Sequence, residues 1–286
     1  MLGLDLREPQ TLEEAFALLE QGDPSIRPMG GGTALMLMMK AQIFKPARLV
    51  SLRRLGGVFD GHEMSADGRF LRIGAMTTFS ELEHSPVVAE HFPVIPQTMT
   101  TLANVRVRNV ASVGGNLAHA DPHLDLPPVW MALAAQVRLV SEAGERTIPV
   151  DDLFVGYYET TLADGELIAE LNVPVRPTWR SSYTKVTTRA AHDWPALGIA
   201  ISAQSERGHI NDLRIVLSAA LDKPTRLTAA EDVLRGGAVD AAALQRAGDA
   251  AVSEVEIHSD SRGSAPYKNH LLRVHLARAL QALVGE

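Results

Sequence analysis

Two glycine-rich segments carry the residue types in this chain that are best suited to binding chemistry. The first loop spans residues 30–35 (GGGTAL), and the second loop spans residues 111–116 (ASVGGN). Glycine has no Cβ, so such segments let backbone N–H groups approach an anion such as a pyrophosphate closely. We expect residues 26–29 and 105–110 to form strands whose ends leave the amides of both loops unpaired. Two such loops in one chain predict a dinucleotide that is held from both sides.

Neither loop is diagnostic by itself. The first loop lacks the Gly-Lys-Ser/Thr of a nucleotide-hydrolase phosphate loop and the spacing of a Rossmann fingerprint, so a tight turn explains it equally well. The second loop is more distinctive, because Val107-Arg108-Asn109 precedes it and Asp125-Leu126-Pro127-Pro128 follows it. A triad of Ser112, His123 and Asp125 is a poorer interpretation, since nothing indicates a nucleophile elbow.

Two histidines and two aspartates alternate just beyond the second loop, as His119, Asp121, His123 and Asp125. A regular strand would place all four on one side, as a metal site requires. Pro122 disfavours that strand, and such side chains beside a phosphate site are more often hydrogen-bonding partners. We therefore predict no metal site and no catalytic residue in this chain.

Composition limits the partners and cofactors. The 286 residues are 46% hydrophobic, and we expect two domains. The net charge of −7 argues against nucleic acid and anionic membranes as partners. The absence of cysteine excludes disulfides, thiol nucleophiles, iron–sulfur ligation and a cysteinyl flavin link, so any redox centre must be organic. Without a signal-peptide pattern or a bilayer-length apolar segment, we expect a cytoplasmic protein with no membrane span.

The elements that position the two loops group into two lobes. A capping-box match at Thr11 predicts a helix over 11–21, and strands at 26–29 and 48–52 complete a first lobe that ends near residue 55. The second lobe, over 56–176, is predicted to contain a strand at 70–75, a helix capped by Thr78, a helix ending near 103, a helix over 126–135, a strand at 136–140, and paired strands near 147–150 and 167–173.

A domain boundary is expected at residues 174–178, where two prolines interrupt both helix and strand pairing. The C-terminal domain, over 177–286, contains no chemical motif of its own. Its predicted elements are three strands of one antiparallel sheet at 182–185, 196–203 and 210–217, with a turn at 206–209, and helices at 225–235, 240–253 and 269–284.

Four ordered motifs together resemble one family, the FAD-binding medium subunits of molybdenum hydroxylases such as carbon monoxide dehydrogenase and the flavin domain of xanthine dehydrogenase. Residues 28–35 and 112–116 are similar to its two flavin loops. Residues 185–194 (KVTTRAAHDW) resemble its Lys-x-x-x-Arg segment with the Asp-aromatic pair that follows, and residues 259–268 (SDSRGSAPYK) resemble its closing motif. The resemblance covers essentially the whole chain.

The resemblance implies an α+β chain with the two-lobed FAD-binding fold of the vanillyl-alcohol-oxidase or PCMH type over 1–176, plus a C-terminal domain. FAD would lie extended between the lobes, with its pyrophosphate on the backbone amides of both loops and on the side chains of Thr33, Ser112 and Asn116. The implied cofactor contacts are Pro28, Met29, Gly30, Gly31, Gly32, Thr33, Ala34, Leu35, Leu102, Ala111, Ser112, Val113, Gly114, Gly115, Asn116, Asp125, Ile168, Lys185 and Trp194.

Four of these residues take distinct roles in the resemblance. Asp125 matches a carboxylate that accepts from ribityl or ribose hydroxyls, and Lys185 matches a basic residue near the flavin end. Ile168, like Leu102, matches an apolar position packed on the cofactor, and Trp194 matches a side chain against the isoalloxazine. The first loop departs from the family pattern, since Gly30 replaces a usual Ala and Ala34 replaces a frequent polar residue. The second loop therefore carries more of the prediction.

The function implied is that of an oxidoreductase subunit whose FAD takes electrons from an iron–sulfur partner and delivers them to an external acceptor. A large subunit would hold the molybdopterin cofactor and a small subunit two two-iron two-sulfur clusters, in a dimer of heterotrimers. The lack of cysteine argues against the 4-hydroxybenzoyl-CoA reductase type. A stand-alone flavin oxidase or reductase of the same fold, such as one that makes UDP-N-acetylmuramic acid, is the alternative, and a nucleotide-binding interaction module is a third possibility.

Overall fold

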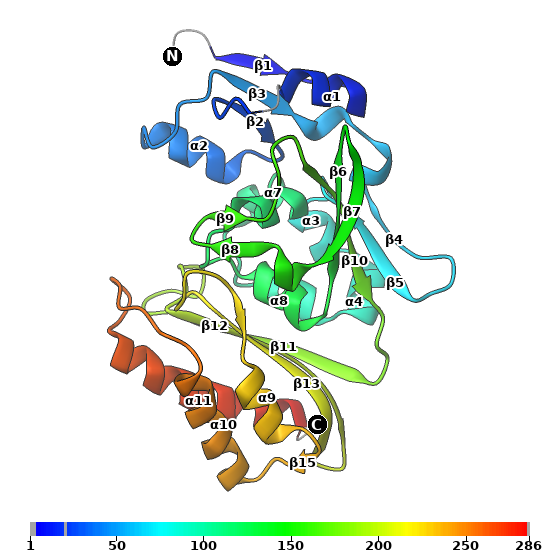
Figure 1. The fold of residues 1–286 in the computed structure, drawn as a ribbon. Coiled ribbons are helices and arrows are strands. Elements are labelled where there is room, and N and C mark those ends of the chain that lie inside the picture. Colours follow the sequence, from blue (N-terminus) through cyan, green and yellow to red (C-terminus); the bar gives the residue numbers. More distant parts are fainter. Residues whose placement is uncertain (1–3, 20–21, 285–286) are drawn as a thin grey trace.

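A computed structural model describes residues 4–19 and 22–284, and Figure 1 shows them as three stacked units. The first lobe lies at the top, the second lobe in the middle, and the C-terminal domain at the bottom. One hydrophobic core joins the two lobes, and a second core belongs to the C-terminal domain. Within the described residues, no helix is both long and apolar enough to cross a membrane.

The first lobe is a three-stranded parallel sheet with the strand order β1-β3-β2. A parallel pair needs a crossover connection, and α2 supplies it between β2 and β3, which places the first loop at the carboxyl end of β2. The strands predicted here are confirmed, whereas the predicted end of the first helix falls on residues 20–21, outside the described residues. The elements are β1 (Asp5–Arg7), α1 (Leu12–Leu19), β2 (Ile26–Met29), α2 (Thr33–Lys40), β3 (Arg48–Ser51) and the 3₁₀ helices η1 (Leu52–Arg54) and η2 (Gly57–Phe59).

The second lobe is built on an antiparallel sheet with the order β4-β5-β10-β6-β7. The capping box at Thr78 is present as predicted, with Glu81 as its second member. The strands predicted as a pair, near 147–150 and 167–173, are β7 and β10, and each pairs with β6 instead. The elements are β4 (His62–Met64), β5 (Phe70–Gly74), α3 (Phe79–Glu83), α4 (Pro86–His91), α5 (Val94–Met99), α6 (Val105–Arg108), α7 (Val113–His119), α8 (Leu126–Ala132), β6 (Gln136–Ser141), β7 (Gly144–Pro149), η3 (Val150–Asp152), β8 (Phe154–Gly156), β9 (Glu159–Thr160) and β10 (Leu167–Pro174).

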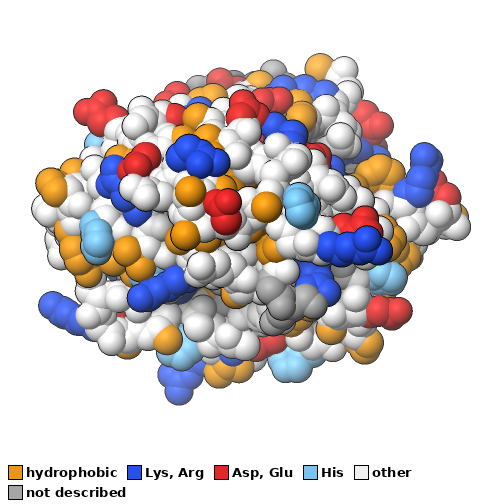
Figure 2. All heavy atoms as spheres, turned by 90° about the horizontal axis from the view of Figure 1, so that it is seen from below, with side chains coloured by type: hydrophobic (Ala, Val, Ile, Leu, Met, Phe, Trp, Pro, Cys, Tyr) orange, Lys and Arg blue, Asp and Glu red, His pale blue; other side chains and the backbone are white. Residues whose placement is uncertain are grey.

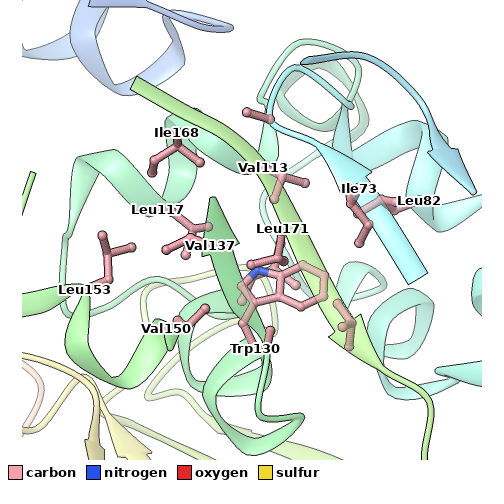
Figure 3. Packing of buried hydrophobic residues seen from close by; sticks show 14 of the residues in the cluster. Ile73, Leu82, Val113, Leu117, Trp130, Val137, Val150, Leu153, Ile168 and Leu171 are labelled. Carbon is pink, nitrogen blue, oxygen red and sulfur yellow. The ribbon is translucent and has the colours of Figure 1, made fainter. Parts of the chain in front are cut away.

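Trp130 on α8 forms the centre of the second lobe. Figure 3 shows it surrounded by side chains from β6, β10 and α7, among them Val137, Leu171 and Leu117, and all four residues are fully buried. The helix begins with prolines in its first turn, as predicted, because the N–H groups at that position need no helical partner. This packing fixes the segment between α7 and α8, which carries the alternating histidines and aspartates.

The strand predicted over 105–110 is wrong, because this segment forms the short helix α6. The side chain of Asn104 accepts hydrogen bonds from the backbone N–H groups of Arg106 and Val107, at 3.0 and 3.2 Å. An asparagine cap of this kind favours a helical turn. Arg108 then donates from Nε to Glu83 at 2.8 Å and from a terminal nitrogen to the Leu102 carbonyl at 3.0 Å.

The C-terminal domain contains the three long strands that were predicted, with two short strands in addition. Residues of β12 alternate between the two cores, and the strand is buried on both faces because α8 covers one face of its sheet and α11 lies against the other. The last helix begins at Ala265, earlier than predicted, and residues 285–286 lie outside the described residues. The elements are β11 (Trp179–Val186), β12 (Leu197–Glu206), β13 (His209–Ser218), β14 (Thr225–Arg226), α9 (Thr228–Leu234), β15 (Gly237–Ala238), α10 (Ala241–Ser253) and α11 (Ala265–Val284).

The sheet of this domain has the order β11-β12-β13-β14, with β15 also paired to β13. The helix predicted at 225–235 starts only after β14. Figure 2 shows the lower end of the molecule, where acidic and basic side chains are interspersed with hydrophobic ones. That face therefore carries no extended patch of one charge.

Candidate functional site

The two glycine loops touch each other. A Cβ on Gly30 would lie 2.5 Å from the Ser112 Oγ, and a Cβ on Gly31 would overlap the carbonyl oxygen of Val110. Glycine is therefore required at position 31, where backbone meets backbone, while a side chain at position 30 would require the Ser112 hydroxyl to move. Part of the bare backbone predicted to bind a ligand thus serves loop-to-loop packing instead.

The first loop presents a continuous row of backbone donors. No N–H group from Gly30 to Leu35 has a hydrogen-bond partner among residues 4–19 and 22–284. Gly32 has a φ of 72°, the left-handed conformation that glycine adopts without strain, and it caps the N-terminus of α2. Because the N-terminal N–H groups of a helix carry a partial positive charge, this loop is suited to hold an anion.

Most backbone N–H groups of the second loop already donate hydrogen bonds within the protein. The N–H groups of Val113 and Gly114 donate to the carbonyls of Thr77 and Ala75, at 3.0 and 2.7 Å, and the N–H of Gly115 donates to the Ser112 Oγ at 3.3 Å. The expectation that both loops offer bare amides is therefore wrong for most of the second loop. The reason is that α7 is anchored to the residues that follow β5.

Two polar groups of the second loop remain available. The Ser112 N–H has no hydrogen-bond partner among the described residues, and the Asn116 Oδ1 is buried without one. A buried polar atom without a partner is costly unless a ligand or water satisfies it. Gly115 is exposed beside them, so the loop still offers a polar surface with open backbone.

The remaining predicted contacts fall into two groups. Leu102, Ala111, Val113 and Ile168 are buried in the core that joins the lobes, and Figure 3 shows Ile168 and Val113 within this cluster. Pro28 and Met29 end β2 directly before the first loop, while Thr33, Ala34 and Leu35 form the first turn of α2. The structure thus brings the two loops and their supporting elements together.

Asp125 and Lys185 lie farther along the chain and form an ion pair with each other. The Lys185 ammonium donates to Asp125 Oδ2 at 2.9 Å and to the Thr101 carbonyl at 2.9 Å, and the Tyr183 hydroxyl donates to Asp125 Oδ1 at 2.8 Å. Both side chains of the ion pair are nearly buried. They link β11 of the C-terminal domain to the second lobe.

The environment of this pair shifts two pKa values upward. Burial raises the pKa of Asp125, an effect that the hydrogen bonds and charge of Lys185 and the hydroxyl of Tyr183 offset only in part. Burial and the neighbouring carboxylate raise the pKa of Tyr183 well above its ordinary value. Sequence reasoning missed Tyr183, although its place two residues before Lys185 on a strand puts both side chains on one face.

The alternating residues beyond the second loop form a hydrogen-bond network. Asp121 accepts from the His123 backbone N–H at 2.9 Å, lies 3.0 Å from His123 Nδ1, and accepts from the Tyr158 hydroxyl at 2.5 Å. Burial by itself would raise the pKa of Asp121, but these hydrogen bonds outweigh it and lower the pKa. No cluster among the described residues has the ligand set of a metal site. The prediction of hydrogen-bonding partners is confirmed, while Tyr158 was missed because only the fold brings it near.

Trp194 is largely solvent-accessible, at 45% exposed. Its ring meets the His123 ring edge to face, with the centroids 5.9 Å apart. The contact joins the loop after β11 to the segment between α7 and α8. Whether Trp194 also touches a cofactor stays a prediction.

The two loops fit a dinucleotide cofactor. Six unpartnered amides at a helix N-terminus suit the negative charges of a pyrophosphate, and the unpaired Asn116 Oδ1 and the open backbone of Gly115 lie on the loop that touches them. The arrangement of two lobes with this cradle between them defines the class of dinucleotide-binding proteins in which both lobes contribute to one site.

Comparison with known proteins gives the family. Residues 3–176 match the model described as FAD binding domain in molybdopterin dehydrogenase, and residues 182–283 match the CO dehydrogenase flavoprotein C-terminal domain. The nicotine 6-hydroxylase medium subunit of Paenarthrobacter nicotinovorans is 32% identical over 95% of this chain and 94% of its own length. The carbon monoxide dehydrogenase medium chain of Hydrogenophaga pseudoflava is 31% identical over 96% and 94%.

Solved structures agree with the sequence relatives. A chain of carbon monoxide dehydrogenase from Hydrogenophaga pseudoflava matches with a TM-score of 0.93 at 33% identity, covering 98% of this chain and 97% of that one. A chain of quinoline 2-oxidoreductase from Pseudomonas putida 86 matches with a TM-score of 0.90 at 27% identity, covering 98% and 96%. The chain belongs to the family of FAD-binding subunits of molybdopterin dehydrogenases, and it is an oxidoreductase subunit of the medium-chain type.

Proposed function

We propose that this chain holds FAD across the two loops and relays electrons from an iron–sulfur subunit to an external acceptor. When bound, FAD accepts and releases electrons, which is chemistry that the side chains of this cysteine-free chain cannot supply. The observation that carries the proposal is the row of unpartnered amides from Gly30 to Leu35, beside the buried unpaired Asn116 Oδ1.

The two loops take unequal parts in holding the cofactor. The first loop donates backbone hydrogen bonds to the pyrophosphate, assisted by the Thr33 hydroxyl. The second loop contributes the Ser112 N–H and the Asn116 side chain, and Gly115 leaves room for the ligand to approach. Leu102, Ile168 and Trp194 are proposed as the apolar contacts farther along FAD.

Asp125 and Lys185 are proposed to act near the flavin end. Their mutual ion pair holds β11 against the second lobe. We propose that Lys185 lies near the end of the flavin that gains negative charge on reduction, which its positive charge would stabilise. We also propose that residues 1–176 and 177–286 are the two domains, because the strand order passes from one sheet to another between β10 and β11.

The partners follow from what this chain lacks and from the names of its relatives. A medium subunit without cysteine requires another subunit to hold iron–sulfur clusters, and we propose a small subunit with two two-iron two-sulfur clusters. A large subunit would oxidise the organic substrate at a molybdopterin cofactor. We propose a dimer of such heterotrimers.

The test is purification of the tagged chain from its native cells. We expect about one FAD per chain, released by acid, with two copurifying chains of which one carries molybdenum and the other iron. A Gly115→Val chain should assemble with the same partners without FAD, whereas the matched control Gly237→Ala should keep FAD. A chain that purifies alone, yellow and active on an organic substrate, would contradict the proposal and favour a stand-alone flavoenzyme.

A further inference from the structure

A cleft lies between the second lobe and the C-terminal domain, and no residue of the glycine loops lines it. Its volume is about 430 Å³, within the range typical of small-molecule sites. It is bounded by the α4–α5 connection, the linker after β10, the first residues of β11 and the end of α11. Its lining includes Phe92, Gln97, Arg176, Trp179 and Arg180.

The cleft is separate from the proposed flavin site. Trp179 begins β11 and Lys185 lies six residues farther on the same strand, next to Asp125. At a rise of about 3.3 Å per residue, the two ends of this strand are roughly 20 Å apart. A ligand in the cleft and a cofactor at Lys185 therefore contact opposite ends of β11.

The cleft contains two arginines, Arg176 and Arg180. Among residues 4–19 and 22–284, neither of them forms an ion pair within 4.0 Å. The neighbouring arginines differ, since Arg214 pairs with Asp151 at 2.5 Å and Arg226 pairs with Glu231 at 2.6 Å. The charge of the Asp212 carboxylate also reaches Arg176, but burial and the charges of Arg214 and Arg226 outweigh it, so this half-buried guanidinium gains by binding an anion.

The geometry of Arg176 leaves its hydrogen-bonding edge available. Its guanidinium carbon lies 4.5 Å from the centroid of the Trp179 ring, which positions the side chain by a cation–π contact. A guanidinium held against an aromatic ring can still donate two parallel hydrogen bonds to a carboxylate or phosphate. Burial and the charge of Arg214 lower the pKa of Arg176, and the charge of the Asp212 carboxylate offsets this only in part.

The walls of the cleft supply the rest of a binding site. Phe92 is buried at its side, and the ring of Trp179 adds a flat apolar surface. The side chain of Gln97 adds a polar group that lines the same space. Such a combination of apolar walls and a few convergent polar groups is typical of sites for organic ligands.

We propose that this interdomain cleft binds a small organic anion, with its carboxylate or phosphate on Arg176 and Arg180 and its flat body against Trp179 and Phe92. The Gln97 amide hydrogen-bonds the remainder of the ligand. Because the cleft is formed by both the second lobe and the C-terminal domain, the ligand also holds these two units together.

The test is isothermal titration of the full chain loaded with FAD, so that the flavin site cannot take up the probe. The probes are adenosine 5′-monophosphate and benzoate, each beside its uncharged counterpart, adenosine and benzamide, with inorganic phosphate as a third anion. We expect at least one organic anion to bind at least ~10-fold more tightly than its uncharged counterpart and than phosphate, since charge-assisted bidentate contacts contribute on this scale. The monophosphate and benzoate arms distinguish a phosphate ligand from a carboxylate ligand.

Variants separate this cleft from other sites. Arg176→Gln should weaken binding of the same probe by ~10-fold or more while FAD content is unchanged, whereas Arg246→Gln, at an exposed position of α10, should leave it within about twofold. The proposal is overturned if charged and uncharged probes bind alike, if no probe binds, or if the two variants weaken binding equally. A chain that fails to take up FAD tests the proposed function instead, so the two failures are distinguishable.

Discussion

The two glycine loops look alike in the sequence and do different work in the structure. The first loop keeps its backbone donors free from Gly30 to Leu35, whereas the N–H groups of Val113, Gly114 and Gly115 already have acceptors within the protein. The first loop therefore supplies the free backbone N–H groups of the proposed anion site. The second loop is fixed by hydrogen bonds within the protein and supplies the side-chain amide of Asn116. A run of glycines in a sequence shows where the backbone carries no side chains. Only the fold shows whether that backbone is open to a ligand or packed against another segment of the chain.

Because of this difference, the first loop is more important for binding an anion than its weaker resemblance to the family motif indicates. The second loop resembles the family motif more closely, and the first departs from it at Gly30 and Ala34. In the structure, Gly30 allows the contact with the Ser112 hydroxyl, and Ala34 contributes a free N–H that any residue type except proline would contribute. The departures from the family motif at Gly30 and Ala34 therefore fall at positions that are proposed to bind through the backbone and not through the side chain.

The largest effect is expected where the loops touch. A Gly31→Ala substitution would force the new Cβ into the Val110 carbonyl, so the loops must separate. We expect the FAD-free protein to lose about 3 kcal/mol of unfolding free energy and the variant to retain no FAD. Urea unfolding and the flavin absorbance of the purified protein measure these losses, with Gly237→Ala as the control at a position where a Cβ would make only an ordinary contact, 3.6 Å from the Leu234 carbonyl oxygen. Wild-type stability in Gly31→Ala would show that the loops do not need this contact.

The next largest effect is expected from a substitution in the second loop that lowers the affinity for FAD much more than the stability of the FAD-free protein. A Cβ on Gly115 would lie 2.9 Å from the Ser112 Oγ and 4.0 Å from the Gly30 Cα, in the space between the loops. We expect Gly115→Val to lower the affinity for FAD by at least ~100-fold, equivalent to about 2.7 kcal/mol. The FAD-free protein should lose no more than about 1 kcal/mol, because only the Ser112 cap must shift. Normal FAD binding by this variant would refute the placement of the second loop in the site.

A matched pair of hydroxyl deletions sharpens the comparison between the loops. The Thr33 hydroxyl has no hydrogen-bond partner among the described residues, whereas the Ser112 Oγ caps α7. Thr33→Val should weaken FAD binding about tenfold, or about 1.4 kcal/mol, and leave the FAD-free protein unchanged. Ser112→Ala should destabilise the FAD-free protein by about 1 kcal/mol. Thermal unfolding without FAD and titration with FAD measure both, and equal losses in the FAD-free proteins would remove the distinction.

The sequence predicted most elements because local signals and packing agree in them. The capping box at Thr78, the prolines that open α8 and the long strands of the C-terminal sheet are examples. The strand predicted for the segment before the second loop was wrong, because the Asn104 side chain caps a short helix there. Short elements decided by one capping residue are the least predictable in physical terms.

The site was predicted less completely than the fold. The glycine-rich segments located the two loops, and the family resemblance implied Asp125 and Lys185, but neither carries information on which amides find acceptors elsewhere. Tyr158 and Tyr183 donate to carboxylates that lie 37 and 58 positions away. Contacts over such separations depend on the topology, so a single sequence cannot assign them.

The smallest effect is expected from lowering the pH. It should reduce the stability of the segment that follows the second loop and leave the first loop unaffected. The first loop contains no titratable side chain, whereas α7 leads into Asp121, whose lowered pKa shows that the folded protein favours its charged form. The unfolded chain then binds the proton more readily. The stability that Asp121 provides is therefore complete above its ordinary pKa of 3.8 and is lost as the pH falls through the lower folded value.

Urea unfolding of wild type and Asp121→Asn at several pH values between 7 and 3 tests this point. We expect wild type to be more stable at pH 7, by less than about 1 kcal/mol because burial offsets part of the hydrogen-bond gain, and the difference to shrink toward pH 3. Thr33→Val supplies the contrast, since its difference from wild type in FAD affinity should not change between pH 7 and 5. A gap between wild type and Asp121→Asn that stays constant down to pH 3 would mean that the carboxylate charge does not hold this segment, and that the second loop is anchored by its backbone bonds to Ala75 and Thr77 alone.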